Sequence, residues 1–255
     1  MQADFWLESW DVGGTKTSFH RNDIHPYAIT YASPEFLKGK RVLVPLCGKD
    51  NVLMWLREHA DHVIGIELAE KAIEQFLQIH NLPYHKTADQ RYEADRLTLI
   101  NRDIFDLQAA DLGHIDFVYD RAALVALPED MREQYRHKID EFMPIGSQCL
   151  VVTLEFLPYL GNMPPFSITP EEMDCYYRNN YFIDHVEQLE QPEHRMVSKF
   201  GLSFLKEHAF MLTKVSDRSS QSWNLGDQYR NKTANPFLSS CRTVLNKAAL
   251  LFSQK

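Results

Sequence analysis

A polar turn and a single acid, each at the end of an apolar run, have residue types that suit a ligand-binding site. The turn is PLCGKD at 45–50, which comes directly after the run RVLV. Gly48 lets the backbone approach a ligand closely, and a helix that starts near Asp50, its expected N-cap, presents free N–H groups there. The acid is Glu67, which ends the run HVIGIE about twenty residues later. Nucleoside-binding βαβ units keep a carboxylate at this spacing for the ribose hydroxyls. The pattern predicts a nucleoside site.

The number of glycines in this turn narrows the ligand class. Dinucleotide-binding folds use three glycines to hold a pyrophosphate, whereas Gly48 is the one glycine of this turn. A nucleoside without phosphates, such as S-adenosylmethionine (SAM), therefore suits it better. The alternative is a tight turn and an exposed acid, and the spacing alone does not separate the two.

The elements that must position these residues alternate between strands and helices. Helices are predicted from near residue 50, over 69–80 and over 129–142, and strands over 41–45, 62–67, 97–100, 115–120 and 148–156. This order predicts an α/β fold with a Rossmann-like, doubly wound and mostly parallel sheet. Further strands are predicted over 181–190 and 202–215, joined by a loop as an antiparallel edge at the C-terminal end. The turn at 45–50 then lies at the carboxyl end of a strand, where such sheets bind ligands.

Composition limits the function classes. The chain has 255 residues with 44% hydrophobic and 24% charged content, which suits one α/β domain with or without an appendage. A formal net charge of −8 argues against a nucleic-acid partner. The N-terminus MQADFWLESW lacks the features of a secretion signal, and the apolar runs are shorter than the ~20 residues of a membrane span. We expect a soluble cytoplasmic protein.

The cysteine and histidine spacings give no metal signature. The four cysteines are far apart in the sequence and contain no Cys-x-x-Cys pair, which fits a reducing compartment. His59 and His62 form no set with carboxylates at ligand spacing. We therefore assign no metal, and Cys47 is interpreted as a small buried residue rather than a nucleophile.

Several motifs resemble those of the thiopurine S-methyltransferase family, especially its bacterial members. The most specific are PLCGK at 45–49 and DRAALVALP at 120–128, and FWLESW, VIGIELAEKAIEQF, RDIFDL and PPFSITPEE occur in matching order. The chain resembles the family from about residue 1 to 215. The resemblance implies a class I SAM-dependent methyltransferase with SAM as cofactor and a small thiol acceptor, thiopurines being the family's defining substrates.

The resemblance also implies the cofactor-binding residues. The N-terminal segment 1–36 covers the cofactor with Trp10, and Trp6 lies on the same stretch. Glu67 holds the ribose hydroxyls. The other implied contacts are Leu46 in the turn, Asp103 and Ile104 along the adenine, and Arg121 between the cofactor and the acceptor.

The implied acceptor side has fewer residues. Phe19 matches an acceptor-side aromatic, and Arg195 matches a second arginine near the acceptor. The loop 160–167 resembles one that borders the acceptor, but its Asn162-Met163 pair departs from the family's glycine-proline run. This departure leaves the acceptor open.

The chemistry of methyl transfer explains these residue types. A sulfonium methyl group is transferred by in-line displacement. The enzyme mainly has to hold the nucleophile, the methyl group and the leaving sulfur in a row in a pocket that excludes water. A thiolate acceptor needs no strong base, and an arginine would favour that anion. Arg121 is assigned this role, with an ion pair to Asp116 or Asp120 as the alternative. His20 is a candidate base, and a structural histidine is the alternative.

The last forty residues do not follow the family pattern. Segment 216–255 carries six Lys or Arg against two Asp and no Glu. Its second half places Phe237, Leu245 and Phe252 on one helical stripe. We predict a catalytic domain at 1–215 and an extension at 216–255 with a short amphipathic helix. That helix docks on a monomer, or it mediates self-association.

The sequence is also compatible with other functions. Related chemistry would methylate halide, thiocyanate, or selenium or tellurium oxyanions. A different class would be a non-catalytic SAM-binding protein that uses occupancy as a signal. The presence of Trp10, Leu46, Glu67 and Arg121 argues against loss of activity.

Overall fold

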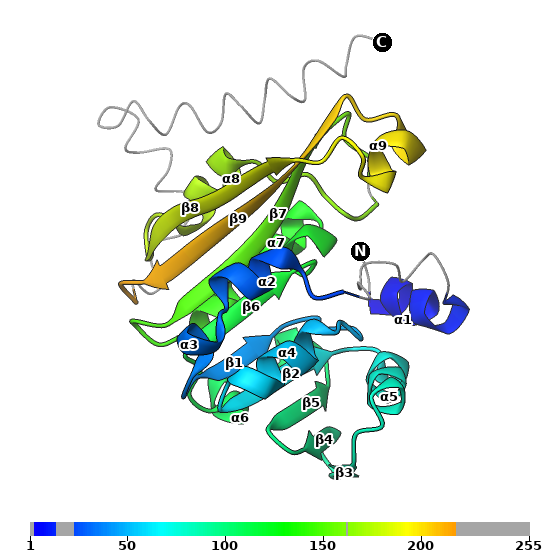
Figure 1. The fold of residues 1–255 in the computed structure, drawn as a ribbon, viewed down its shortest axis with the longest axis vertical. Coiled ribbons are helices and arrows are strands. Elements are labelled where there is room, and N and C mark those ends of the chain that lie inside the picture. The colour runs from blue at the N-terminus through cyan, green and yellow to red at the C-terminus, as the bar shows by residue number, and fades with distance from the viewer. Residues whose placement is uncertain (1–2, 14–22, 162, 218–255) are drawn as a thin grey trace.

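The computed structural model describes residues 3–13, 23–161 and 163–217, and these build one nine-stranded sheet covered by helices (Figure 1). The strand order is β3-β4-β5-β2-β1-β6-β7-β9-β8. The strands are β1 (Arg41–Val44), β2 (His62–Glu67), β3 (Tyr84–Lys86), β4 (Arg91–Ala94), β5 (Leu97–Asn101), β6 (Phe117–Arg121), β7 (Gln148–Leu157), β8 (Tyr181–Glu190) and β9 (Phe204–Lys214).

The centre of the sheet is parallel and both edges are antiparallel. Strands β5, β2, β1, β6 and β7 run parallel, and β9 and β8 follow β7 in antiparallel pairing. The predicted fold class, with its antiparallel C-terminal edge, is confirmed. The sequence reading missed the second edge, where β4 pairs antiparallel with β5 and β3 pairs with β4. Strand β3 has three exposed residues, so no buried alternation marks it.

Helices cover both faces of the sheet, as a doubly wound fold requires. One face carries α2 (Pro26–Tyr31), α3 (Pro34–Leu37), α4 (Val52–His59) and α5 (Glu70–Ile79). The other carries α6 (Ala109–Leu112), α7 (Glu129–Phe142) and α8 (Pro170–Tyr177). Helix α1 (Ala3–Val12) contacts α5, and α9 (Arg195–Phe200) lies between β8 and β9 where a loop was predicted.

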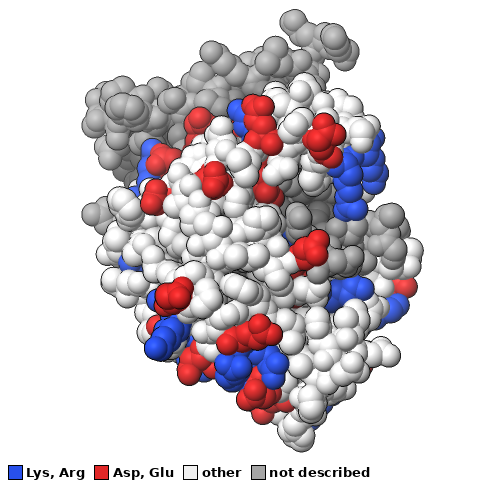
Figure 2. All heavy atoms as spheres, in the orientation of Figure 1, with Lys and Arg blue, Asp and Glu red and all other residues white. Residues whose placement is uncertain are grey.

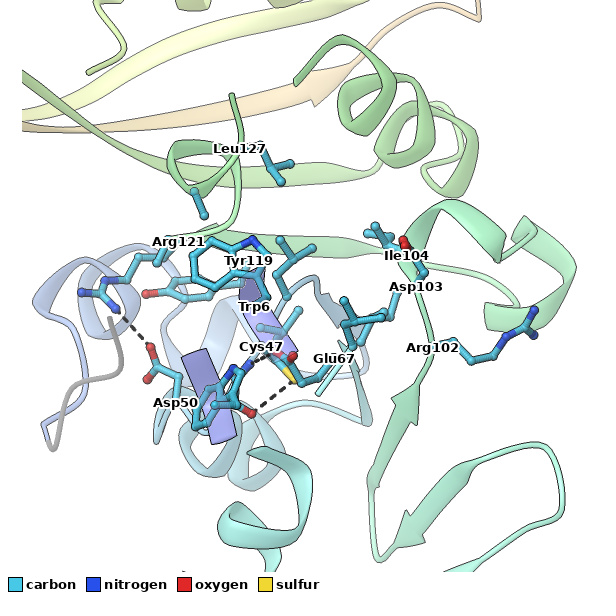
Figure 3. Close-up of a pocket in the computed structure, with 18 of the residues that line it drawn as sticks. Trp6, Cys47, Asp50, Glu67, Arg102, Asp103, Ile104, Tyr119, Arg121 and Leu127 are labelled. Carbon is cyan, nitrogen blue, oxygen red and sulfur yellow. Dashed lines mark hydrogen bonds and ion pairs between the residues drawn. The ribbon is translucent and has the colours of Figure 1, made fainter. Parts of the chain in front are cut away.

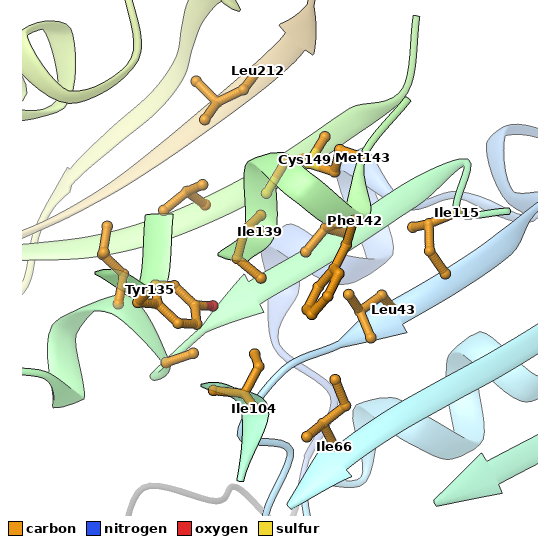
Figure 4. Packing of buried hydrophobic residues seen from close by; sticks show 14 of the residues in the cluster. Leu43, Ile66, Ile104, Ile115, Tyr135, Ile139, Phe142, Met143, Cys149 and Leu212 are labelled. Carbon is orange, nitrogen blue, oxygen red and sulfur yellow. The ribbon is translucent and has the colours of Figure 1, made fainter. Parts of the chain in front are cut away.

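Helix α7 shows how the apolar pattern becomes core. Tyr135, Ile139 and Phe142 are buried on one face of it, and they pack among side chains of the sheet such as Leu43 (Figure 4). Burying one such apolar side chain stabilises the fold by roughly 1.5–3 kcal/mol. The helix has the bounds that its sequence period predicts.

The chain order creates a switch point beside β1. The chain runs outward from β1 to β2 and β5, and then returns across β1 to form β6 on its other side. The connections after β1 and β6 therefore leave the sheet in different directions, and a crevice opens at the carboxyl ends of these two strands. The PLCGKD turn follows β1, and the DRAALVALP motif begins in β6.

The surface and the helices bear on the classes of partner. Figure 2 shows Lys and Arg interspersed with Asp and Glu over the face in view, unlike the continuous basic surface of many nucleic-acid-binding proteins. None of the helices in the described ranges combines the length and the apolar character that a membrane span requires.

Candidate functional site

A pocket opens at the switch point, over the carboxyl ends of the central strands (Figure 3). It is lined by all seven residues predicted to contact the cofactor: Trp6, Trp10, Leu46, Glu67, Asp103, Ile104 and Arg121. These residues come from α1 and from the ends of β1, β2, β5 and β6, so the fold gathers positions that are far apart in the sequence.

Glu67 is the most strictly positioned carboxylate of the pocket. It ends β2 and is 7% exposed. Its Oε2 accepts a hydrogen bond from the Gly48 N–H at 2.8 Å, and its Oε1 accepts one from the Ala69 N–H at 2.8 Å. Burial raises its pKa, and these backbone hydrogen bonds oppose the rise. Each oxygen keeps acceptor capacity for a further donor in the pocket.

The turn between β1 and α4 adopts an uncommon backbone conformation. Leu46 has φ 48° and Gly48 has φ 53°, both in the left-handed region. At the end of β6, Ala122 has φ 62°. Left-handed leucine and alanine cost on the order of 1–3 kcal/mol each, and such residues cluster at functional sites. Both turns that border the crevice therefore carry strain.

Helix α1 brings two tryptophans to the pocket. Trp10 is buried and packs against Ala69 and Ala72 at the start of α5. A Cβ atom on Gly48 would lie 3.4 Å from Cζ2 of Trp10, so the indole ring rests directly on the turn. The Lys49 Nζ lies 5.9 Å from the centre of the same ring, within cation–π range.

The opposite wall of the pocket starts at β5. The Asn101 side chain donates hydrogen bonds to the carbonyls of Glu67 at 3.1 Å and Leu68 at 2.7 Å, which ties the ends of β5 and β2 together. Asp103 Oδ1 then accepts from the Phe105 N–H at 3.0 Å and caps a short 3₁₀ helix, η2 (Ile104–Asp106). The Ile104 side chain is buried. These contacts fix the position of this wall.

Arg121 forms an ion pair with Asp50 rather than with either predicted alternative. Its Nη1 lies 3.1 Å from Asp50 Oδ2, and each side chain is 14% exposed. The helix α4 begins at Val52 with Asn51 at its N-cap position, one residue later than the expected Asp50, whose Oδ1 accepts the Val52 N–H at 3.0 Å. Asp116 instead accepts the backbone N–H of Arg41.

Asp120 precedes Arg121 on β6, and its side chain lies on the face of the sheet that α7 covers. It is fully buried, and it accepts hydrogen bonds from the Leu124 N–H at 3.0 Å and the Tyr135 hydroxyl at 2.7 Å. Burial raises its pKa to about 6, against the lowering effect of these donors. The carboxyl thus fixes the chain directly after Arg121.

A family model described as thiopurine S-methyltransferase matches residues 1–215. The chain belongs to the thiopurine S-methyltransferase family. A thiopurine S-methyltransferase from Pseudomonas aeruginosa is 38% identical over 224 residues, covering 84% of this chain and 100% of the relative. One from Legionella pneumophila is 36% identical over 217 residues, covering 82% and 97%.

Solved structures agree on the fold. A 1,6-didemethyltoxoflavin-N1-methyltransferase from Burkholderia thailandensis, with bound S-adenosylhomocysteine, is similar with a TM-score of 0.57 at 13% identity, over 84% of this chain and 87% of that one. A magnesium protoporphyrin IX methyltransferase from Synechocystis, with bound SAM, has a TM-score of 0.58 at 10% identity, over 83% and 96%. The family match therefore identifies the protein as a SAM-dependent methyltransferase, and its fold agrees.

Within the described part of the chain, Arg195 is the predicted site residue that lies outside the pocket. It begins α9 with an exposed side chain. Phe19, His20 and the predicted C-terminal helix lie outside the described residues.

Sequence reasoning also missed pocket residues of the methyltransferase. Tyr119, Leu127 and Met131 line the pocket, from β6 and from the chain after it. Their signal was present, because they lie in or beside the DRAALVALP motif. Cys47 lines the pocket too, and burial raises the pKa of its thiol well above the usual range. This agrees with its interpretation as a small buried residue.

Proposed function

We propose that this methyltransferase moves the methyl group of SAM to the sulfur of a small thiol of the thiopurine type. The observation that carries the proposal is one pocket that joins a backbone-anchored carboxylate, Glu67, to a partly buried arginine, Arg121. The related proteins named thiopurine S-methyltransferase support the acceptor class.

The residues of the pocket fit SAM in kind. Glu67 has two carboxylate oxygens that suit the two ribose hydroxyls, and buried side chains such as Ile104 suit a flat adenine. The left-handed turn at Gly48 lets the backbone approach closely. In this proposal Trp10 and Trp6 hold α1 over the cofactor as part of the covering segment 1–36.

Bound SAM supplies an electrophilic methyl group, whose bond to the sulfonium sulfur breaks as the bond to the acceptor sulfur forms. The chain aligns the two sulfurs and excludes water from between them. Apolar side chains such as Leu127 form the part of the pocket wall that excludes water. The Arg121 guanidinium, which stays charged, favours a thiolate over a thiol near it.

The acceptor side of the proposal rests on the family resemblance. Phe19 and Arg195 are proposed to contact the acceptor, and His20 to take a proton where the acceptor arrives as a thiol. The catalytic unit is proposed to end near residue 215, where the family match ends.

Turnover of methyl-labelled SAM with a panel of acceptors tests the proposal. The panel contains a thiopurine, a simple aromatic thiol, thiocyanate, iodide, selenite and tellurite. We expect label on the sulfur of the thiols, with one S-adenosylhomocysteine (SAH) formed per methyl group. Faster labelling of an inorganic anion would overturn the acceptor class. Binding of SAH without labelling of any acceptor would favour a non-catalytic sensor.

A further inference from the structure

One end of the pocket carries the ion pair between Arg121 and Asp50. Arg121 has a proposed role in the reaction, and Asp50 has none so far. In Figure 3, Asp103 and Ile104 lie at one end of the pocket, the Asp50–Arg121 pair lies at the opposite end, and Glu67 lies between them. If adenine and ribose occupy the first two positions, the amino-acid part of SAM reaches Asp50 and Arg121. This step rests on the proposed function.

Asp50 is held so that it faces this end of the pocket. One carboxylate oxygen accepts the Val52 N–H at the start of α4, and the other contacts the Arg121 guanidinium at 3.1 Å. An ionised carboxylate offers about four acceptor sites, so these two contacts leave others for a bound donor. The side chain is 14% exposed, so a ligand at this end would meet a carboxylate largely withdrawn from water.

Charge complementarity identifies the group that Asp50 suits. The amino-acid part of SAM carries an α-carboxylate and an α-ammonium on the same carbon, and the protein presents one guanidinium and one carboxylate side by side. An ammonium group buried without an anionic or polar partner would be costly. We propose that Asp50 binds the α-ammonium of SAM, and that the neighbouring α-carboxylate lies against Arg121.

Two other roles for Asp50 predict different behaviour. As an acceptor for the Val52 N–H alone, it would support the turn before α4 and affect every ligand of the pocket equally. As a partner that only orients Arg121, it would act through the α-carboxylate and not through the ammonium. A ligand that lacks only the α-ammonium and one that lacks the whole amino acid separate the three roles.

Calorimetric titration of the full chain and its Asp50→Asn variant tests the assignment. The asparagine oxygen still accepts the Val52 N–H, while the negative charge is lost. The ligands are SAH, 5′-methylthioadenosine, which lacks the amino acid, and an SAH analogue with hydrogen in place of the α-amino group. We expect Asp50→Asn to weaken SAH roughly ten- to a hundredfold, as for a hydrogen bond between charged groups, and to leave the other two ligands unchanged.

Asp103→Asn is the matched control, the same chemical change at the other end of the pocket. It should affect SAH and methylthioadenosine alike. Equal weakening of all three ligands by Asp50→Asn, weakening of the deaminated analogue, or no change for SAH would each overturn the assignment. If the wild-type chain binds neither SAH nor methylthioadenosine, the proposed function fails instead. Should Asp50→Asn not fold, the wild-type chain must still prefer SAH to the deaminated analogue, and equal affinity for the two overturns the assignment.

Discussion

The nucleoside end and the charged end of the pocket are built in different ways. At the nucleoside end, Glu67 is fixed by backbone N–H groups of Gly48 and Ala69, within 19 and 2 residues of it in the sequence. At the charged end, Asp50 and Arg121 are 71 residues apart and meet through side chains. Two strands joined by a single helix, β1 and β2, fix the first end, and the return of the chain across the sheet to β6 creates the second.

This difference has a consequence for function. Backbone donors hold a group rigidly and tolerate changes of neighbouring side chains, so the nucleoside end suits a part of the ligand that never changes. A side-chain pair can be altered by one substitution, so the charged end suits the place where the amino-acid part of SAM meets an acceptor that differs between methyltransferases. The following variants test this division, in order of decreasing effect.

Glu67→Ala should have the largest effect, and it should act on binding. Loss of the carboxylate removes its contacts with the ribose, and we expect SAM affinity to fall by roughly 1.5–3 kcal/mol. Calorimetric titration measures the change, and the exposed Glu74→Ala on α5 serves as the control. Circular dichroism must show an intact fold, because the variant also leaves the N–H groups of Gly48 and Ala69 without this acceptor. Unchanged affinity in a folded variant would remove Glu67 from the site.

Arg121→Lys should act on the rate more than on binding. Lysine keeps the charge but lacks the planar fork that contacts Asp50 and that is proposed to contact the α-carboxylate of SAM and the acceptor. We expect kcat to fall about tenfold, or ~1.4 kcal/mol, with a smaller loss of SAM affinity. Equal losses would place the arginine on the cofactor carboxylate alone. No loss in either would leave it a structural role.

Asp120→Asn should change the pH dependence of stability by a smaller amount. The unfolded chain releases this proton near pH 4, whereas the folded chain keeps it to about pH 6. Raising the pH through this window therefore destabilises the folded wild-type chain relative to the variant. Between pH 5 and 7 we expect the wild type to lose ~1 kcal/mol of unfolding free energy relative to Asp120→Asn. Denaturant titrations at both pH values measure it, and a constant difference would contradict the raised pKa.

The two ends also show what the sequence could predict. The span of β2 and the twenty-residue spacing from the turn placed Glu67 correctly in the pocket, because both depend on local order. The period of α7 predicted its bounds for the same reason. The contact between Asp50 and Arg121 depends on how β1 and β6 lie side by side, so the sequence did not predict it, and the alternative considered for Arg121, an ion pair with Asp116 or Asp120, named other partners.

Short helices and strands were the other features that the sequence did not predict. Strand β3 and helix α9 have three and six residues, too few to show a period, and both were missed. Helix α8 begins with a capping box at Thr169 and Glu172, a signal that was present in the sequence and was not used. The roles of Phe19, His20 and Arg195 on the acceptor side stay predictions.

A crystal structure of the chain with bound SAH would test the division of the pocket most directly. We expect the ribose hydroxyls on the Glu67 carboxylate, the adenine beside Asp103 and Ile104, and the α-ammonium within hydrogen-bond distance of Asp50. An SAH molecule bound in the reverse direction, with its amino acid at Asp103 and its adenine at Arg121, would contradict it.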